Sequence, residues 1–218
     1  MEKNQIIEAI KKEKLIVIVR GVEKEKLIPL CEALYLGGVR LVEITFDMKG
    51  TVTPAQTSEC ISMLTKAFDG RMLIGAGTVV TLEQAQAAYD GGAKYLISPN
   101  TDEKIIKFAN EHSIASIPGA MTPTEIVAAY SFGADFVKVF PADTLGLPYI
   151  KAVRAPLSGI PMLAVGGVNE KNVSDFLATG ISGVGVGSNI TKRDLIAAED
   201  YAAITDLARK YTDAISNS

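Results

Sequence analysis

Hydrophobic and polar residues recur along this chain in one arrangement. An amphipathic, helix-like stretch ends near a glycine, and a short apolar run follows that ends in Gly, Pro or Thr. A glycine at this point supplies the left-handed backbone conformation that turns a helix back toward a strand. The arrangement is clearest over residues 33–46, 87–100, 128–142 and 176–188. It predicts a chain built from repeated βα units.

Eight short apolar runs are predicted as strands. They are Leu15–Val19, Val39–Thr45, Met72–Ala76, Lys94–Ser98, Ile114–Ile117, Asp135–Phe140, Pro161–Val165 and Ser182–Val186. Apolar strands that alternate with helices are typical of a parallel sheet, and eight of them close into a (β/α)8 TIM barrel. The competing open, doubly wound sheet normally has a Gly-x-Gly-x-x-Gly after its first strand, where this chain has only Arg20-Gly21-Val22. We therefore expect a single barrel domain over residues 1–218.

Helix starts are predicted where a polar residue is followed three positions later by Glu or Gln, which is the spacing of an N-terminal capping box. The pairs are Thr81 with Gln84, Asn100 with Glu103, and Thr122 with Glu125. At the N-terminus, isoleucines at positions 6, 7 and 10 have helical spacing among charged residues. This pattern predicts a short amphipathic helix before the first strand, and not a signal peptide.

Composition and charge exclude several classes of partner. Of the 218 residues, 48% are hydrophobic and 22% are charged, the net charge is -3, and there is no basic block. This argues against binding to nucleic acid or to an anionic membrane, and no apolar stretch approaches the roughly 20 residues of a membrane span. Cys31 and Cys60 lack metal-binding spacing, so we expect free thiols in a reducing cytoplasm and no metal site.

Two ionisable residues interrupt apolar strands, and this is the strongest sign of function. Glu43 lies in the second predicted strand and Lys138 in the sixth, although charged side chains are rarely buried without a partner or a role. Arg20 follows the first strand on the face that would carry Ile16 and Ile18. If these faces point into the barrel, a Lys, a Glu and an Arg converge at its mouth, but alternation alone leaves the inward face open.

Each of these residues also has an ordinary structural explanation. The stem of Lys138 could cover apolar surface while its amine reaches water. Glu43 could be a buried ion-pair partner of that lysine, and Arg20 could be a surface residue. The only histidine, His112, ends a predicted helix away from every strand end and is interpreted as an ordinary helix C-terminal residue.

Glycine-rich loops follow the last two predicted strands. Gly166 and Gly167 come after the seventh strand, and Gly187 and Ser188 come after the eighth. In TIM barrels these loops, with the N-terminus of a short helix, often form a phosphate site. We expect that helix to begin near Ser188. Either loop alone could be a simple turn, but the two together favour a phosphate site.

The motifs at the strand ends, taken in order, resemble those of the 2-keto-3-deoxy-6-phosphogluconate (KDPG) and 4-hydroxy-2-oxoglutarate (KHG) aldolase family. The matching segments are IVIVRGV, GGVRLVEITF, IGAGTV, YLISPN, IPGAMTPTE, DFVKVFPA, LAVGGV and VGVGS. The resemblance implies a class I aldolase on a (β/α)8 barrel, usually a homotrimer, with no cofactor. Its substrates would be a KDPG-like acid or KHG, cleaved reversibly to pyruvate plus glyceraldehyde 3-phosphate or glyoxylate.

The resemblance also assigns roles to residues. It implies that Lys138 forms the Schiff base and that Glu43 is the general acid and base. The other implied site residues are Thr78, Pro99 and Phe140 in the pyruvyl pocket, Arg20 for anionic substrate groups, and Gly166, Gly167, Gly187 and Ser188 for phosphate. Partial desolvation of the lysine between two phenylalanines would favour its neutral, nucleophilic form.

Two departures from the family pattern affect the substrate more than the reaction. Many members carry an arginine four residues after the glutamate, where this chain has Asp47, so Arg20 or Lys49 would have to replace it. Val165 stands where a threonine is often found. A galactonate-type stereoisomer or an unphosphorylated substrate therefore stays open. Two other classes also stay open, a phosphosugar epimerase or isomerase on the same barrel and a non-catalytic sugar-phosphate binding protein.

Overall fold

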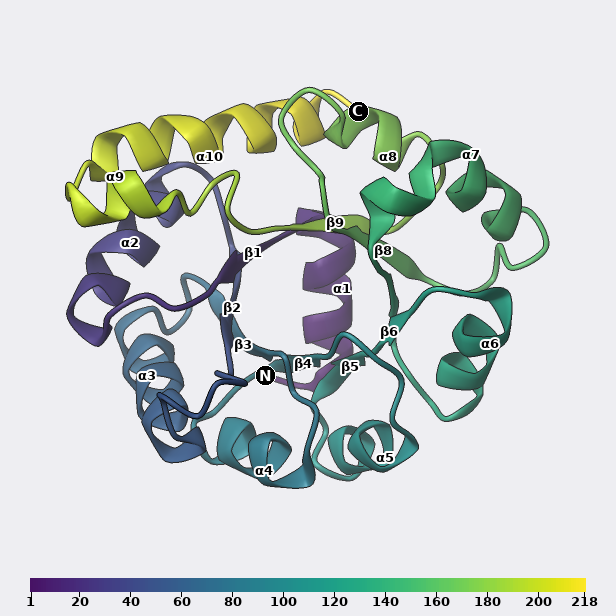
Figure 1. Ribbon diagram of the computed structural model, residues 1–218, viewed down its shortest axis with the longest axis horizontal. Helices are drawn as coiled ribbons and strands as arrows, with labels where there is room; N and C mark the ends of the chain where they lie inside the picture. The colour runs from purple at the N-terminus through teal and green to yellow at the C-terminus, as the bar shows by residue number, and fades with distance from the viewer.

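The computed structural model describes residues 1–218 and contains one sheet of nine parallel strands. Hydrogen-bonded neighbours follow the order β5-β4-β3-β2-β1-β9-β8-β7-β6, and Figure 1 shows the strands as a ring surrounded by helices. The strands are β1 Leu15–Val19, β2 Leu41–Thr45, β3 Leu73–Gly77, β4 Tyr95–Ile97, β5 Ala115–Ile117, β6 Gly119–Ala120, β7 Val137–Val139, β8 Met162–Val165 and β9 Gly183–Val186.

Strands β5 and β6 together occupy the place of the fifth predicted strand. Pro118 separates them, because proline has no N–H to donate to a neighbouring strand. The carbonyls of Ser116 and Pro118 still accept hydrogen bonds from the N–H groups of Phe136, at 3.2 Å, and Lys138, at 2.8 Å. These bonds join both halves of the strand to the β7 segment and close the ring. The (β/α)8 barrel is confirmed, with its fifth strand in two pieces.

The helices form the outer ring, apart from the first. They are α1 Lys3–Glu13, α2 Lys24–Leu36, α3 Pro54–Ala67, α4 Leu82–Asp90, α5 Glu103–Glu111, α6 Pro123–Ser131, α7 Ala142–Arg154, α8 Val173–Leu177, α9 Arg193–Ala197 and α10 Tyr201–Ser216. The predicted capping boxes at Thr81 and Thr122 are confirmed. The one at Asn100 is wrong, because Asp102 caps α5 by accepting a hydrogen bond from the N–H of Lys104. None of the helices is long and apolar enough to cross a bilayer.

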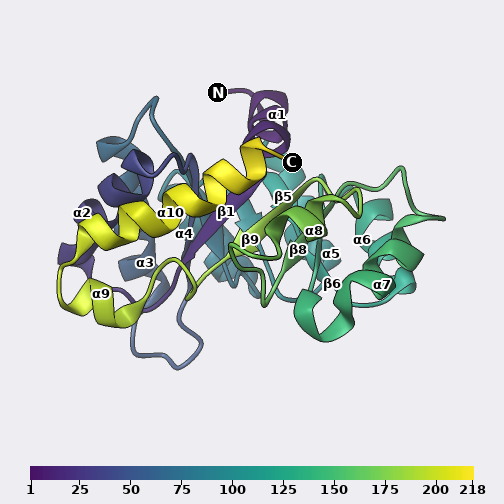
Figure 2. The ribbon, with the colours of Figure 1, turned by 90° about the horizontal axis from the view of Figure 1, so that it is seen from above.

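The inward faces of the strands build a small core inside the barrel. It consists of Ile6, Ile10, Ile16, Leu41, Tyr95, Ile97, Ala115, Ile117, Phe136 and Leu163. The two isoleucines at positions 6 and 10 come from α1, which lies across one end of the barrel (Figures 1 and 2). Because Ile16, Leu41 and Phe136 point inward, strand alternation places Glu43 and Lys138 inside the barrel as well.

Replacing Ile10 by alanine should destabilise the protein strongly. Ile10 is completely buried between α1 and the barrel interior, so its loss leaves a cavity that the rigid ring of strands cannot fill. We expect the free energy of unfolding to fall by about 2–5 kcal/mol, measured by urea denaturation. The matched control is Ile28→Ala, because Ile28 is 40% exposed. An equally small effect of both substitutions would show that α1 does not stabilise the barrel.

Candidate active site

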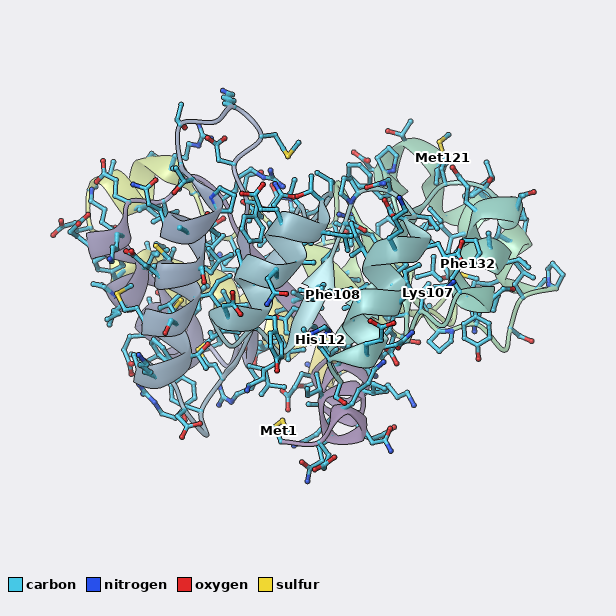
Figure 3. The ribbon with its side chains drawn as sticks, turned by 90° about the horizontal axis from the view of Figure 1, so that it is seen from below. Met1, Lys107, Phe108, His112, Met121 and Phe132 are labelled. Carbon is cyan, nitrogen blue, oxygen red and sulfur yellow. The ribbon has the colours of Figure 1, made fainter.

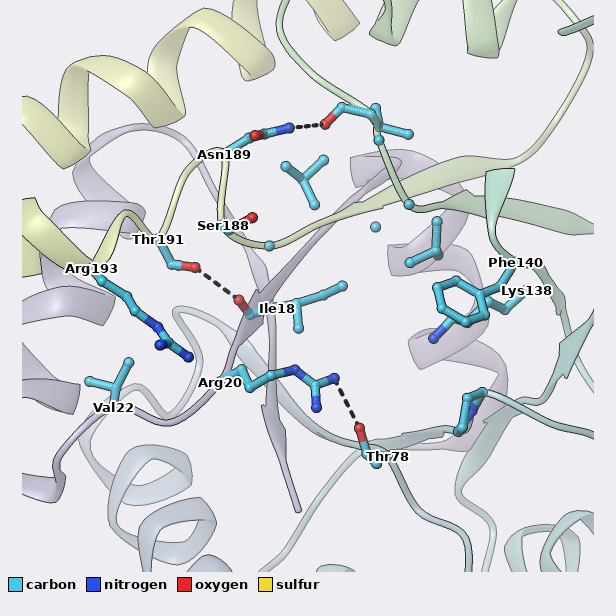
Figure 4. Close-up of a pocket in the computed structure, with 18 of the residues that line it drawn as sticks. Ile18, Arg20, Val22, Thr78, Lys138, Phe140, Ser188, Asn189, Thr191 and Arg193 are labelled. Carbon is cyan, nitrogen blue, oxygen red and sulfur yellow. Dashed lines mark hydrogen bonds between the residues drawn. The ribbon is translucent and has the colours of Figure 1, made fainter. Parts of the chain in front are cut away.

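A pocket of about 470 Å³ opens at the carboxyl ends of the strands, opposite α1 (Figure 4). Parallel barrels place their reactive side chains at this end, because the βα loops gather there. The pocket is lined by nine of the ten predicted site residues: Arg20, Thr78, Pro99, Lys138, Phe140, Gly166, Gly167, Gly187 and Ser188. The tenth, Glu43, lies in the barrel interior beside the pocket.

Lys138 comes from β7, where its backbone pairs with Gly119 of β6 and Leu163 of β8. The residue is only 7% exposed, and it lines the pocket. Its Nζ lies 4.6 Å from the centroid of the Phe140 ring. Burial lowers the pKa of Lys138, Glu43 opposes this shift, and the Arg20 guanidinium adds to it. The environment therefore favours the neutral amine over the ammonium ion.

Glu43 comes from β2, between Ile18 of β1 and Gly75 of β3. It is 2% exposed and its Oε2 has no hydrogen-bond partner. Burial raises the pKa of Glu43 to about 7, although Lys138 and Arg20 act in the opposite direction. No ion pair joins Glu43 to Lys138, so the purely structural explanation of Glu43 is not what the structure shows.

A small cavity beside Glu43 adjoins the pocket. Glu43 lines this cavity together with Ile18, Val165 and Gly185, and those three residues also line the pocket. On the β3 side, Gly77 leaves room for the carboxyl, because a Cβ atom at position 77 would collide with Oε1. Sequence reasoning did not single out Gly77 for this role.

Arg20 and Thr78 meet across the pocket mouth (Figure 4). Nη2 of Arg20 donates a hydrogen bond to Oγ1 of Thr78 at 3.1 Å. Thr78 has a φ of 58°, a left-handed conformation that is uncommon for a side chain branched at Cβ. Arg20 is exposed, but its guanidinium is held at the pocket by this hydrogen bond.

The two glycine-rich loops contain backbone N–H groups that have no partner in the protein. The N–H groups of Gly166, Gly167, Gly187 and Ser188 make no hydrogen bond within the protein, and all four residues line the pocket. Gly166 and Gly167 have φ values of 104° and 68°, which favour glycine. Unpaired N–H groups beside a pocket suit an anionic ligand.

The expected helix near Ser188 is wrong. The carbonyl of Gly187 accepts hydrogen bonds from the N–H groups of Ile190, at 2.9 Å, and Thr191, at 3.0 Å, which forms a turn. Helix α9 begins only at Arg193. The pocket therefore has a turn, and no helix N-terminus, beside the β9 glycines.

Sequence reasoning missed three polar residues of the pocket: Asn189, Thr191 and Arg193. The first two tie the loop down, because Nδ2 of Asn189 donates to the Val168 carbonyl and Oγ1 of Thr191 donates to the Ile18 carbonyl. The side chain of Arg193 has no such bond. In the sequence, the only sign of Arg193 as a pocket residue is its position shortly after the last predicted strand.

His112 is far from this site. It forms the C-cap of α5, where its ring stacks on Phe108 with centroids 4.0 Å apart and its Nδ1 lies 2.8 Å from the carbonyl of the same residue. Figure 3 shows His112 on the side of the molecule toward Met1 and α1, while Met121 lies at the other end. This agrees with the interpretation of His112 as a helix-end residue. The structure contains no cluster of three side chains suited to a metal ion.

Comparison with known proteins gives one consistent result. The profile of the KDPG and KHG aldolase family matches residues 6–207. A probable 2-dehydro-3-deoxy-6-phosphogalactonate aldolase from Rhizobium meliloti is 36% identical over 186 residues, which is 85% of each chain. A 2-dehydro-3-deoxy-phosphogluconate aldolase from Treponema pallidum is 32% identical over 208 residues, covering 94% of this chain and 95% of the other.

A solved structure extends the match to three dimensions. The KDPG aldolase of Legionella pneumophila, with pyruvate captured as a covalent carbinolamine, has a TM-score of 0.83 at 28% identity and covers 96% of this chain and 97% of its own. This chain belongs to the KDPG and KHG aldolase family. The resemblance seen in the strand-end motifs is confirmed, and the aldolase is a carbon–carbon lyase.

The aldolase uses Asp47 to shape a loop. The carboxylate of Asp47 accepts hydrogen bonds from the N–H groups of Lys49, Thr51 and Val52 and from the Thr51 hydroxyl. The Thr51 hydroxyl and these N–H groups hold the pKa of Asp47 below its usual range. Neither Asp47 nor Lys49 lines the pocket. Of the two residues suggested to replace an arginine at position 47, Arg20 and Lys49, only Arg20 lines it.

The stability of the aldolase should depend on pH through Glu43. Its pKa rises from 4.5 to about 7 on folding, so the folded state holds this proton more tightly than the unfolded state does. The stabilisation is complete below about pH 4.5 and disappears as the pH rises through 7. Relative to Glu43→Gln, the wild type should lose up to about 3 kcal/mol of unfolding free energy between those pH values. Parallel pH profiles in chemical denaturation would contradict this expectation.

Proposed function

We propose that this aldolase reversibly cleaves a 2-keto-3-deoxy-6-phospho sugar acid to pyruvate and glyceraldehyde 3-phosphate through a Schiff base on Lys138. The observation that carries the proposal is a buried amine that lines the pocket and has a lowered pKa, together with a buried carboxyl, Glu43, whose pKa is raised. The aldolases from Rhizobium and Treponema are named for the galactonate and gluconate forms. KHG, which would give glyoxylate, is the unphosphorylated alternative.

Lys138 acts as the nucleophile. Its neutral Nζ attacks the C2 carbonyl of the keto acid and forms a carbinolamine, and loss of water then gives a protonated imine. Burial of Lys138 supports this role, because the desolvated ammonium form is disfavoured and more free amine exists near neutral pH. The Legionella aldolase, captured with pyruvate as a carbinolamine, supports the same first step.

Glu43 moves the protons. With a pKa of about 7, its carboxyl exists in both forms at neutral pH and can accept or donate a proton. It takes the proton of the C4 hydroxyl as the C3–C4 bond breaks, and the imine receives the electron pair to become an enamine. The same carboxyl then protonates C3, and water hydrolyses the imine to release pyruvate and restore the amine.

The remaining pocket residues position the two ends of the substrate. Arg20 and Thr78, which are already hydrogen-bonded to each other, bind the carboxylate next to the reacting carbonyl. Pro99 and Phe140 shape the pyruvyl pocket. The free N–H groups of the four loop residues Gly166, Gly167, Gly187 and Ser188 bind the phosphate.

Borohydride trapping tests the Schiff base and separates this proposal from an epimerase or a binding protein. With pyruvate and sodium borohydride, the wild type should gain one reduced adduct at Lys138, identified by peptide mass spectrometry. Lys138→Ala should form no adduct and lose turnover, whereas Lys151→Ala, at an exposed lysine of α7, should behave like the wild type. Glu43→Gln should lower kcat by about 10²–10⁴-fold. Turnover by Lys138→Ala would refute the mechanism.

Substitution of Ser188 by aspartate tests the phosphate site. A carboxylate beside the free N–H groups should repel the phosphate and raise KM for the phosphorylated substrate by about 10-fold or more. The matched control is Ser158→Asp, in the turn before β8 at the opposite end of the barrel. An unchanged KM for Ser188→Asp, in steady-state assays of pyruvate release, would place the phosphate elsewhere.

The proposal includes a homotrimer that works in the cytoplasm as a single-domain subunit. Two points support the trimer. The family that the strand-end motifs resemble is usually trimeric, and the apolar side chains of Met121, Val127 and Tyr130 are exposed on and beside α6. Side chains of this kind commonly become buried between subunits.

A further inference from the structure

Three basic side chains and no carboxylate line the pocket. They are Arg20, Lys138 and Arg193. Of the acids outside it, Glu43 lines the adjoining cavity and Asp143 lies against Gly166 and Gly167. Arg20 is held by Thr78, and Lys138 is the proposed nucleophile. Arg193 is the one of the three without a partner or a role.

Arg193 is attached to a segment that is fixed to the barrel. Two residues before it, Oγ1 of Thr191 donates a hydrogen bond to the Ile18 carbonyl at 3.2 Å, and Ile190 is fully buried. Figure 4 shows the Arg193 side chain extending from this segment into the pocket, on the same side as Arg20 and below Ser188 and Thr191. Its backbone is anchored, and its guanidinium makes no hydrogen bond or ion pair.

The loop after β2 provides no cation to the pocket, so none from that loop competes with Arg193 for an anionic ligand. Asp47 is bonded to its own loop, and Lys49 lies outside the pocket. Arg193 does border the neighbouring hollow that this loop encloses, so it stands between the loop and the pocket. The β2 loop thus brings no positive charge to this side of the pocket, and Arg193, from the segment after β9, provides it instead.

We propose that Arg193 binds the phosphate of the substrate and determines the preference for phosphorylated over unphosphorylated keto acids. Its guanidinium pairs with two phosphate oxygens in the planar, bidentate geometry that arginine favours. The free N–H groups of Gly187 and Ser188 bind the remaining oxygens. Arg20 and Arg193 then bind opposite ends of one substrate, the carboxylate and the phosphate. This inference rests on the proposed function and names the residue that selects its substrate.

The test compares Arg193→Ala with the wild type on KDPG and on the same acid without its phosphate. A charge-assisted hydrogen bond of this kind is worth about 10–100-fold in affinity. Arg193→Ala should therefore raise KM for KDPG by about that factor and leave KM for the unphosphorylated acid within about twofold. Arg193→Lys should recover part of the loss, because it keeps the charge but not the bidentate geometry.

Two controls isolate the effect. Lys192→Ala removes the adjacent exposed cation, which does not line the pocket, and should leave both KM values unchanged. Pyruvate carries no phosphate, so the rate of borohydride trapping by Arg193→Ala should match that of the wild type. An equal rise in KM for both acids, or no rise for either, would overturn the assignment of Arg193.

A binding measurement separates this inference from the proposed function. Inorganic phosphate, titrated into each protein by calorimetry, should bind about 10-fold or more weakly to Arg193→Ala than to the wild type or Lys192→Ala. If the wild type cleaves no keto acid and is not trapped by pyruvate, the proposed function fails, and the titration still decides the role of Arg193. Equal phosphate binding by all three proteins would refute that role even in an active aldolase.

Discussion

The proposed chemistry of this protein depends on the burial of one amine and one carboxyl inside a ring of parallel strands. Lys138 and Glu43 are both nearly inaccessible to water, and no ion pair joins them. Desolvation without pairing disfavours both charged forms, which lowers one pKa and raises the other. A close ion pair would instead have stabilised both charges and left neither group suited to nucleophilic attack or proton transfer near neutral pH.

The barrel keeps these groups in place because its interior is layered. A lower layer of apolar side chains, closed by α1, occupies the ring. The two ionisable residues occupy the next positions along their strands, between that layer and the open pocket. Gly75 and Gly77 of β3 leave space because they have no side chain. A Cβ atom at position 75 would collide with the Tyr95 ring, and one at position 77 would collide with the Glu43 carboxyl. Small residues on one strand thus make space for reactive residues on another.

The side of the pocket where we propose that substrate anions bind is built differently, from loops. It combines free backbone N–H groups with guanidinium groups from two segments distant in the sequence, after β1 and after β9. Strands β1 and β9 are hydrogen-bonded neighbours, so their loops meet although they are about 170 residues apart. Loops of this kind tolerate sequence change.

Much of this protein follows from local sequence. Apolar strand runs, glycines at helix ends and capping boxes determine each element, because these signals act over a few residues. The same patterns identified Lys138 and Glu43, since a charge within an apolar run is conspicuous by itself. They failed where a competing residue lay close by, as at Asn100, where Asp102 provides the cap.

Only the tertiary structure decided which strand face points inward, how Pro118 divides the fifth strand, and which cations reach the pocket. These properties depend on closure of the ring, which brings side chains together across long sequence separations. Arg193 shows the difference most clearly. In the sequence, Arg193 looks like an ordinary exposed residue at the start of a helix. Only the pairing of β9 with β1 places its side chain beside Arg20 in the pocket.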